Sequence, residues 1–326
     1  MLLHRRQFLH LAAGVAALPA ASRIAWAQSY PSRPVHLLVG YAPGGTIDIV
    51  ARLIGQWLSK RLGQSFVIEN RPGAATNIAT EAVVRSPPDG YTLLAAGLST
   101  NTINQSLYTN LNFDFMRDIA MVAGVGTSPL VLEVNPSLPV NSVPELIAYA
   151  KANPGKVSLA SFGSGTISHV AGELFKMTAG VEMVHVPYRG SAPMLTDLIG
   201  GQILAAVDAL PASIEYIKIG KLRALAVTTA DRSPALPDVP ALSDFLPGFE
   251  ATSSIAISAP KSTPREIIDK LNKEVDASLA DPVFTARLAD LGATAFRASP
   301  ADLDKFVVEQ TEKWAKVVRT ANIKPE

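Results

Sequence analysis

Two loops place glycines and hydroxyl side chains between a strand-like run and a helix-like run. The first is Tyr41-Ala42-Pro43-Gly44-Gly45-Thr46-Ile47-Asp48 and the second is Phe162-Gly163-Ser164-Gly165-Thr166-Ile167-Ser168-His169. Glycine lets the backbone approach a ligand closely, and a helix N-terminus adds unpaired N–H donors and a partial positive charge. These loops therefore suit a carboxylate or a phosphate. The same residues would equally make tight turns whose hydroxyls only cap the helices, so both interpretations stand.

A third polar, glycine-bearing loop, Gly97-Leu98-Ser99-Thr100-Asn101-Thr102, follows another predicted strand. In open α/β sheets, ligands bind beyond the carboxyl ends of the strands. Three such loops at the same end of the strands favour an anion-binding cleft, with Ser99 and Thr100 among its candidate residues.

The sequence contains none of the common catalytic motifs. Ser164 is not a nucleophile elbow, because Phe162 stands two residues before it where a glycine is required. The chain has no Walker loop, no Gly-x-Gly-x-x-Gly after the first strand and no His-Glu-x-x-His. We therefore predict a binding protein, without a catalytic residue, cofactor or metal.

Four charged or titratable residues allow two interpretations each. His169 either lines the cleft or is structural, and Asp48 either braces its loop through the helix dipole or meets the ligand. Asp208 ends a strand, where it either faces the cleft, holding water or a ligand hydroxyl, or stays within the fold. Arg189 either attracts an anion or is an ordinary surface arginine.

Strand-like and helix-like segments alternate along the chain. Apolar runs predict strands at 35–41, 66–69, 91–96, 130–134, 157–161, 183–186, 203–207, 222–228 and 254–258. Helical spacing predicts helices at 47–62, 78–85, 143–151, 168–179, 193–199, 213–219, 264–279, 281–291 and 300–320. Unbroken apolar strands separated by helices indicate an α/β protein with mostly parallel sheet covered on both faces.

The length of 326 residues favours two α/β domains over one large sheet. We predict a discontinuous first domain, residues 28–126 plus 256–326, and a second domain, residues 127–255, with the ligand cleft between them. The Gly- and Pro-bearing stretches 124–129 and 247–260 are the candidate crossings, and the C-terminal helices return to the first domain.

Residues 1–27 read as an export signal. Arg5 and Arg6 precede an apolar run, Leu11–Ala21, that is too short for a bilayer, which takes about 20 residues. Ala25-Trp26-Ala27 then fits a small-x-small cleavage site. The paired arginines resemble a twin-arginine signal, although Sec export of such a sequence is also open.

Charge and cysteine content narrow the class further. Cleavage after Ala27 would remove Arg5, Arg6 and Arg23 and no acidic residue, so the formal charge changes from +1 to −2. A slightly acidic chain argues against a nucleic-acid binder. With no cysteine, the chain has no disulfide and no lipid-modified N-terminal Cys. We therefore expect a free periplasmic protein.

Beyond these patterns, the sequence resembles the tripartite tricarboxylate transporter receptor family, also called Bug proteins, over essentially the whole mature chain. The resemblance is carried by 30–35 (Tyr-Pro-Ser-Arg-Pro-Val), 43–48 (Pro-Gly-Gly-Thr-Ile-Asp), 69–74 (Glu-Asn-Arg-Pro-Gly-Ala), 88–94 (Pro-Asp-Gly-Tyr-Thr-Leu-Leu), 164–166 with 169–174, 185–190 (His-Val-Pro-Tyr-Arg-Gly), 197–202 and 220–228. Each motif is weak alone, but the set in this order behind an export signal is specific.

The resemblance implies a two-domain, type II-like periplasmic binding fold that closes on its ligand by hinge motion. It also implies that backbone N–H groups, hydroxyls and bridging water from the glycine-bearing loops hold a carboxylate. Carried onto this chain, the ligand-binding residues are Ala42, Gly44, Gly45, Thr46, Gly163, Ser164 and Thr166, followed by Tyr41, Ser99, Thr100, His169 and Asp208. The family's longer Gly-rich stretch is replaced here by Ala75-Thr76-Asn77, and the crossing at 251–255 lacks an aromatic.

The function implied is capture of a small carboxylate in the periplasm and its delivery to a membrane permease of the tripartite tricarboxylate type. We expect a monomer that binds no nucleic acid. Two alternatives remain at this stage: a sensory partner that presents its ligand to a membrane kinase, and a periplasmic enzyme acting on a carboxylate through His169 or Asp208.

Overall fold

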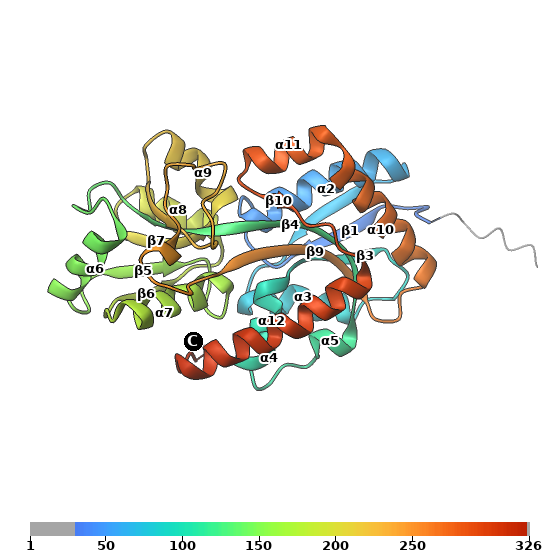
Figure 1. Ribbon diagram of the computed structural model, residues 1–326. Helices are drawn as coiled ribbons and strands as arrows, with labels where there is room; N and C mark the ends of the chain where they lie inside the picture. Colours follow the sequence, from blue (N-terminus) through green and yellow to red (C-terminus); the bar gives the residue numbers. More distant parts are fainter. Residues whose placement is uncertain (1–29, 325–326) are drawn as a thin grey trace, which may run out of the picture. The chain divides into compact units, whose positions relative to one another are not determined.

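A 16-residue strand, β4 (Ile119–Val134), joins two groups of strands in the computed structural model, which describes residues 30–324. β4 pairs with β9 (Thr252–Pro260) up to Pro129, and with β7 (Ala205–Ala209) and β8 (Arg223–Val227) from Leu130 onward. We call residues 33–129 and 252–324 the first lobe and residues 130–251 the second lobe. Figure 1 shows β4 and β9 running side by side toward the second lobe.

The first lobe surrounds a mixed sheet. Its parallel pairs join β1 to β2 and to β3, and its antiparallel pairs join β9 to β3 and β4 and join β10 to β4. Its other elements are β1 (Val35–Val39), α2 (Thr46–Leu62), β2 (Phe66–Asn70), a 3-10 turn (Ala74–Thr76), α3 (Asn77–Val84), β3 (Thr92–Gly97), α4 (Leu98–Leu107), α5 (Phe115–Asp118), α10 (Arg265–Ala280), α11 (Pro282–Asp290), β10 (Thr294–Ala295) and α12 (Pro300–Thr320).

The second lobe continues the same sheet. The parallel strands run inward from the edge in the order β6, β5, β7, and β7 pairs with β4 in antiparallel orientation. Its elements are α6 (Val143–Ala152), β5 (Ser158–Ser161), α7 (Ile167–Ala179), β6 (Val184–Pro187), α8 (Ser191–Ile199), β7, α9 (Leu210–Lys218), β8 and a 3-10 turn (Leu242–Asp244). The carboxyl ends of β5 and β7 lead into α7 and α9. The starts of these two helices contact the first lobe, because Ile167 N donates to Thr100 Oγ1 and Ala209 O accepts from Thr46 Oγ1.

Local sequence explains where the key helices begin and end. α2 starts after Gly45, buries apolar residues at helical spacing such as Ile47, Ile54 and Leu58, and stops at Gly63 in the left-handed conformation. α12 begins at a proline after Ser299, whose side chain forms a capping box with Asp302.

The cores of the lobes are separate apolar clusters. In the first lobe, Leu38 and Leu94 of the sheet pack with Phe115 and with Leu303 and Val307 of α12. Figure 1 shows α2 and α11 on one side of these strands and α3, α4 and α12 on the other. Full burial of each such side chain contributes about 1.5–3 kcal/mol, so α12 is anchored in the first lobe.

The predicted α/β class is confirmed. Leu303 and Val307 of α12 lie in the core of the first lobe. The predicted loop 97–102 is wrong, because α4 begins at Leu98. The strand predicted at 130–134 is only the end of β4, and the predicted crossing at 124–129 is the part of β4 just before its pairing changes from β9 to β7. The exact domain boundaries stay a prediction.

Candidate functional site

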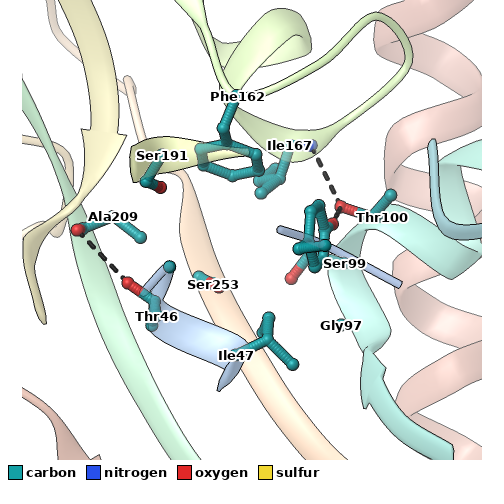
Figure 2. Close-up of a pocket in the computed structure, with 12 residues that line it drawn as sticks. Thr46, Ile47, Gly97, Ser99, Thr100, Phe162, Ile167, Ser191, Ala209 and Ser253 are labelled. Carbon is teal, nitrogen blue, oxygen red and sulfur yellow. Dashed lines mark hydrogen bonds between the residues drawn. The ribbon is translucent and has the colours of Figure 1, made fainter. Parts of the chain in front are cut away.

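Five helices begin around one pocket between the lobes. The first turns or N-caps of α2 and α4 from the first lobe, and of α7, α8 and α9 from the second, all reach it. The pocket has about 360 Å³ of empty space, part of which is open solvent. Its lining consists of Tyr41, Gly45, Thr46, Ile47, Gly97, Ser99, Thr100, Phe162, Ile167, Ser191, Ala209 and Ser253 (Figure 2). We call this the first compartment.

The lining of the first compartment carries no formal charge. In α2, α4, α8 and α9 no side chain of the described residues caps the first turn, whereas Thr166 caps α7 by accepting from His169 N. The first turn of a helix presents N–H donors and the positive end of its dipole. Such an arrangement can hold an anion without a charged side chain.

Hydrogen bonds tie the lobes together across this compartment, as Figure 2 shows in part. Thr46 Oγ1 donates to Ala209 O at 3.4 Å, and Ile167 N donates to Thr100 Oγ1 at 3.3 Å. Thr100 Oγ1 also accepts from the Tyr41 hydroxyl at 2.8 Å, which leaves the Thr100 proton for a further acceptor. Burial raises the pKa of Tyr41, and the bond to Thr100 lowers it less, so Tyr41 stays a neutral donor.

The loop before α2 is braced by a buried carboxylate. Asp48, 2% exposed, accepts from Gly44 N at 2.9 Å, from Arg52 at 2.9 Å and from Asn70 Nδ2 at 2.9 Å. Burial alone would raise the pKa of Asp48, but the hydrogen bonds from Arg52, Gly44 and Asn70 outweigh it and hold the pKa below its usual value. The bracing interpretation of Asp48 is confirmed.

A second compartment adjoins the first and is open on one side. It encloses about 1050 Å³, part of it open to solvent, and shares Tyr41 and Phe162 with the first compartment. Residues 72–76 of the first lobe face Ser164 and Arg189 of the second lobe across it. Arg189 is the one charged residue in its lining.

A chain of buried polar groups lies behind the first compartment. Asp208, fully buried, accepts from Ser191 Oγ at 2.5 Å, from Ala209 N at 2.8 Å and from Ser213 Oγ at 3.0 Å. Ser213 Oγ is also 2.8 Å from Glu133 Oε1. A hydroxyl has one proton, so Ser213 can bond both carboxyls only if one of them is protonated.

Burial raises the pKa values of both acids in this chain. For Asp208 the pKa reaches about 6, because burial outweighs the hydrogen bonds from Ser191, Ala209 and Ser213. For Glu133 burial and then the charge of Asp208 raise the pKa well above its usual value. Burial thus favours the protonated form of both acids, and the proton that Ser213 requires on one of them can lie between Asp208 and Glu133, while Ser191 is held by its hydrogen bond to Asp208.

His169 lies behind the second glycine loop with two possible metal ligands, Glu173 and His185. Its Nδ1 accepts from Gly165 N at 3.1 Å, so its proton sits on Nε2, which faces Glu173 at 3.7 Å. Its ring stacks on His185 at 3.9 Å and 11°, so the ring-plane lone pairs of the two histidines run side by side rather than converging. This geometry supports the loop and does not suit a metal ion.

The predicted ligand-binding residues divide into three groups. Tyr41, Gly45, Thr46, Ser99 and Thr100 line the first compartment. Gly163, Ser164 and Thr166, with Tyr41 again, line the second. Neither compartment is lined by the other four predicted residues, Ala42, Gly44, His169 and Asp208. The backbone N–H of Ala42 donates to Arg189 O and that of Gly44 donates to Asp48. The side chains of His169 and Asp208 are buried behind the pocket wall.

Seven residues of the first compartment were not predicted as ligand-binding. Ile47, Gly97, Phe162 and Ile167 lie within the three loops predicted to form the cleft, whereas Ser191, Ala209 and Ser253 lie outside them. Ser191 follows Gly190 at the start of α8, which repeats the pattern of a glycine and a hydroxyl at a helix start. Ala209 directly follows Asp208 and is the N-cap of α9. The end of this strand was predicted to reach the cleft through the side chain of Asp208, whereas it is the neighbouring Ala209 that lines the pocket. Ser253 lies in β9 and carries no local signal.

The chain matches known proteins over most of its length. The sequence profile described as "Tripartite tricarboxylate transporter family receptor" matches residues 50–323. Protein BugT of Bordetella pertussis is 38% identical over 300 residues, which cover 91% of this chain and 92% of that protein.

Solved structures agree with these sequence matches. The structure "R. palustris Rpa4515 with adipate" superposes with a TM-score of 0.89 at 40% identity, covering 91% of this chain and all of that one. "MatC (Rpa3494) from Rhodopseudomonas palustris with bound malate" gives 0.85 at 32% identity, covering 89% of this chain and all of that one. The periplasmic binding protein BugD gives 0.87 at 36% identity, covering 91% and 100%.

Proposed function

Because this chain belongs to the tripartite tricarboxylate transporter receptor family, whose members are solute-binding receptors and not enzymes, we propose that it captures a small carboxylate between its lobes. We further propose that it delivers this ligand to a membrane transporter of the tripartite tricarboxylate type. The observation that carries the proposal is the convergence of five helix N-termini on a pocket without charged residues.

The carboxylate of the ligand occupies the first compartment. Backbone N–H groups come from Gly45, the N-cap of α2, and from Thr46 and Ser191, the first residues of α2 and α8. The Thr100 hydroxyl also has a proton to donate. Anions at helix N-termini gain about 0.3–1 kcal/mol per helix at exposed sites and more when partly buried. Several aligned termini therefore replace the arginine that many carboxylate sites use.

The remainder of the ligand extends past Tyr41 and Phe162 into the second compartment. Two relatives fit this arrangement, since the structures named above contain adipate and malate, which both carry a second carboxylate. The exposed Arg189 side chain is the group in this lining that a second carboxylate would meet.

The protein acts in the periplasm after export and cleavage behind Ala27. The predicted export signal, residues 1–27, lies outside the described residues. None of the helices within residues 30–324 is long and apolar enough to cross a bilayer. Ligand entry and release use opening of the lobes about β4 and β9, the strands that pass between them.

Native mass spectrometry of gently purified protein, followed by thermal unfolding with a panel of carboxylates, tests the proposal. We expect a retained carboxylate and a stoichiometric rise in Tm with its concentration, without turnover. The Gly45→Val variant serves as the control, because its side chain fills the first compartment. A protein that no carboxylate stabilises, or that converts its ligand chemically, contradicts the proposal.

A further inference from the structure

Three consecutive residues in the wall of the second compartment have left-handed backbone conformations. Ala74, Ala75 and Thr76 have φ values of 46°, 47° and 72°. In the described part of the chain, the only other non-glycine residue with positive φ is Asn322. Residues with a Cβ adopt this region singly and at a cost in free energy, so a run of three persists only where the surroundings enforce it.

The neighbours of this segment supply that enforcement. Asn104 Nδ2 of α4 donates to Ala75 O at 2.7 Å, and Asn101 Nδ2 donates to Thr76 Oγ1 at 3.2 Å. Both asparagines are 1% exposed. On the other side, a Cβ at Gly40 would lie 2.5 Å from Thr76 Cβ, so the end of β1 leaves room for this segment only because residue 40 is glycine.

The same helix that holds this segment also lines the first compartment. Ser99 and Thr100 in the first turn of α4 face the predicted carboxylate site, and Asn101 and Asn104 in the next turns hold residues 75 and 76. The distance between the carboxylate site and this wall is therefore fixed by one rigid element rather than by a free loop.

We propose that Ala74 and Ala75 are specificity-determining residues, which set how long a carboxylate ligand the second compartment accepts. This rests on the proposed function. Glycine adopts positive φ without steric cost, so it would suit the backbone at both positions better than alanine. The two alanines add methyl groups to a wall that faces Ser164 and Arg189, and these methyl groups limit the room for the distal part of the ligand.

The double substitution Ala74→Gly and Ala75→Gly tests this inference. Affinities for linear α,ω-dicarboxylates from four to eight carbons are measured by calorimetry for the wild type and the variant. We expect affinity for acids longer than the wild-type optimum to rise about tenfold, the discrimination that one methylene group typically gives. We expect Tm to stay the same or rise, because glycine adopts the positive φ of residues 74 and 75 without steric cost.

Ala79→Gly is the matched control, because Ala79 is fully buried in the right-handed helix α3 just beyond the wall. It should lower Tm and leave the ranking of the acids unchanged. If the double variant ranks the acids by affinity as the wild type does, the proposed role of Ala74 and Ala75 is wrong. A changed affinity ranking in Ala79→Gly would contradict it as well. If no acid binds the wild type, the proposed carboxylate-binding function is wrong. If acids bind but the double variant keeps the wild-type ranking, only the role of Ala74 and Ala75 is wrong.

Discussion

Tyr41 and Phe162 meet edge to face between the lobes, with ring centroids 5.7 Å apart and ring planes at 87°. Tyr41 follows β1 in the first lobe and Phe162 follows β5 in the second, and both line both compartments. The pair therefore lies where the two compartments meet and is one of the contacts between the lobes.

Replacing Phe162 by Ala should weaken ligand binding. An edge-to-face pair contributes about 0.5–1.5 kcal/mol beyond its buried area, so we expect a loss of about three- to tenfold in affinity by calorimetry and faster dissociation in stopped flow. Tyr41→Phe is the comparison, because it keeps the ring contact and removes only the bond to Thr100. Equal affinities of wild type and Phe162→Ala would rule out this role.

Gly45→Val should abolish most binding without unfolding the protein. Gly45 has φ −82° and a Cβ there would lie no closer than 3.7 Å to its neighbours, so a side chain is tolerated but projects toward Ser191. Crowding of a packed site costs about 1–3 kcal/mol, which corresponds to a rise in Kd of about five- to 150-fold.

Gly63→Ala is the comparison variant for Gly45→Val, because it should lower the stability of the protein without changing its affinity for the ligand. Gly63 ends α2 with φ 72° in open space, so alanine there should cost about 1 kcal/mol in stability and leave Kd unchanged. Circular dichroism and calorimetry on both variants check the pair of predictions. Unimpaired binding by Gly45→Val would remove the first loop from the site.

Asp208→Asn should flatten the dependence of stability on pH. The pKa of Asp208 is raised to about 6 by burial, so the folded state binds its proton more tightly than the unfolded chain does. The stability that this group contributes is complete below about pH 4 and is lost as pH rises through about 6.

The size of that effect follows from the shift. About two pKa units correspond to about 3 kcal/mol. The unfolding free energy of wild type minus that of Asp208→Asn should therefore fall by on the order of 2–3 kcal/mol between pH 4 and pH 7. Urea titrations at several pH values measure it. A constant difference across this range would show that Asp208 titrates normally.

Arg189→Gln should distinguish dicarboxylates from monocarboxylates. Because Arg189 is exposed, its contact with a second carboxylate is worth no more than about 0.2–1 kcal/mol. We expect affinity for a dicarboxylate to fall about two- to fivefold at low salt, with the matched monocarboxylate unaffected. The difference should shrink at high salt. Equal losses for both acids would assign Arg189 a structural role.

The sequence allowed prediction of the elements whose signals are local. Gly45 and Thr46 follow an apolar strand and begin an amphipathic helix, and both line the pocket as predicted. α12 spans Pro300 to Thr320 as predicted, because a proline in the first turn and an apolar stripe mark its start and its extent.

Elements that depend on distant contacts were not predictable in the same way. α4 contains mostly polar residues, and Asn101 and Asn104 are buried where their amides donate to residues 75–77 and to Thr80. The glycines at 124–129 predicted a crossing between domains but not that this crossing would be continuous strand. In the structure Gly124 permits a close approach, since a Cβ there would lie 2.3 Å from Phe296 O, and the register with β9 shifts beside it.

β9 lies between β3 and β4 in the sheet, although it is the last of these strands in the sequence. When synthesis or translocation has delivered the chain only as far as residue 251, the whole second lobe is present but the facing edges of β3 and β4 have no partner. Unpaired strand edges attract other chains. These two edges are therefore open to wrong pairing until the final quarter of the chain emerges and completes the first lobe.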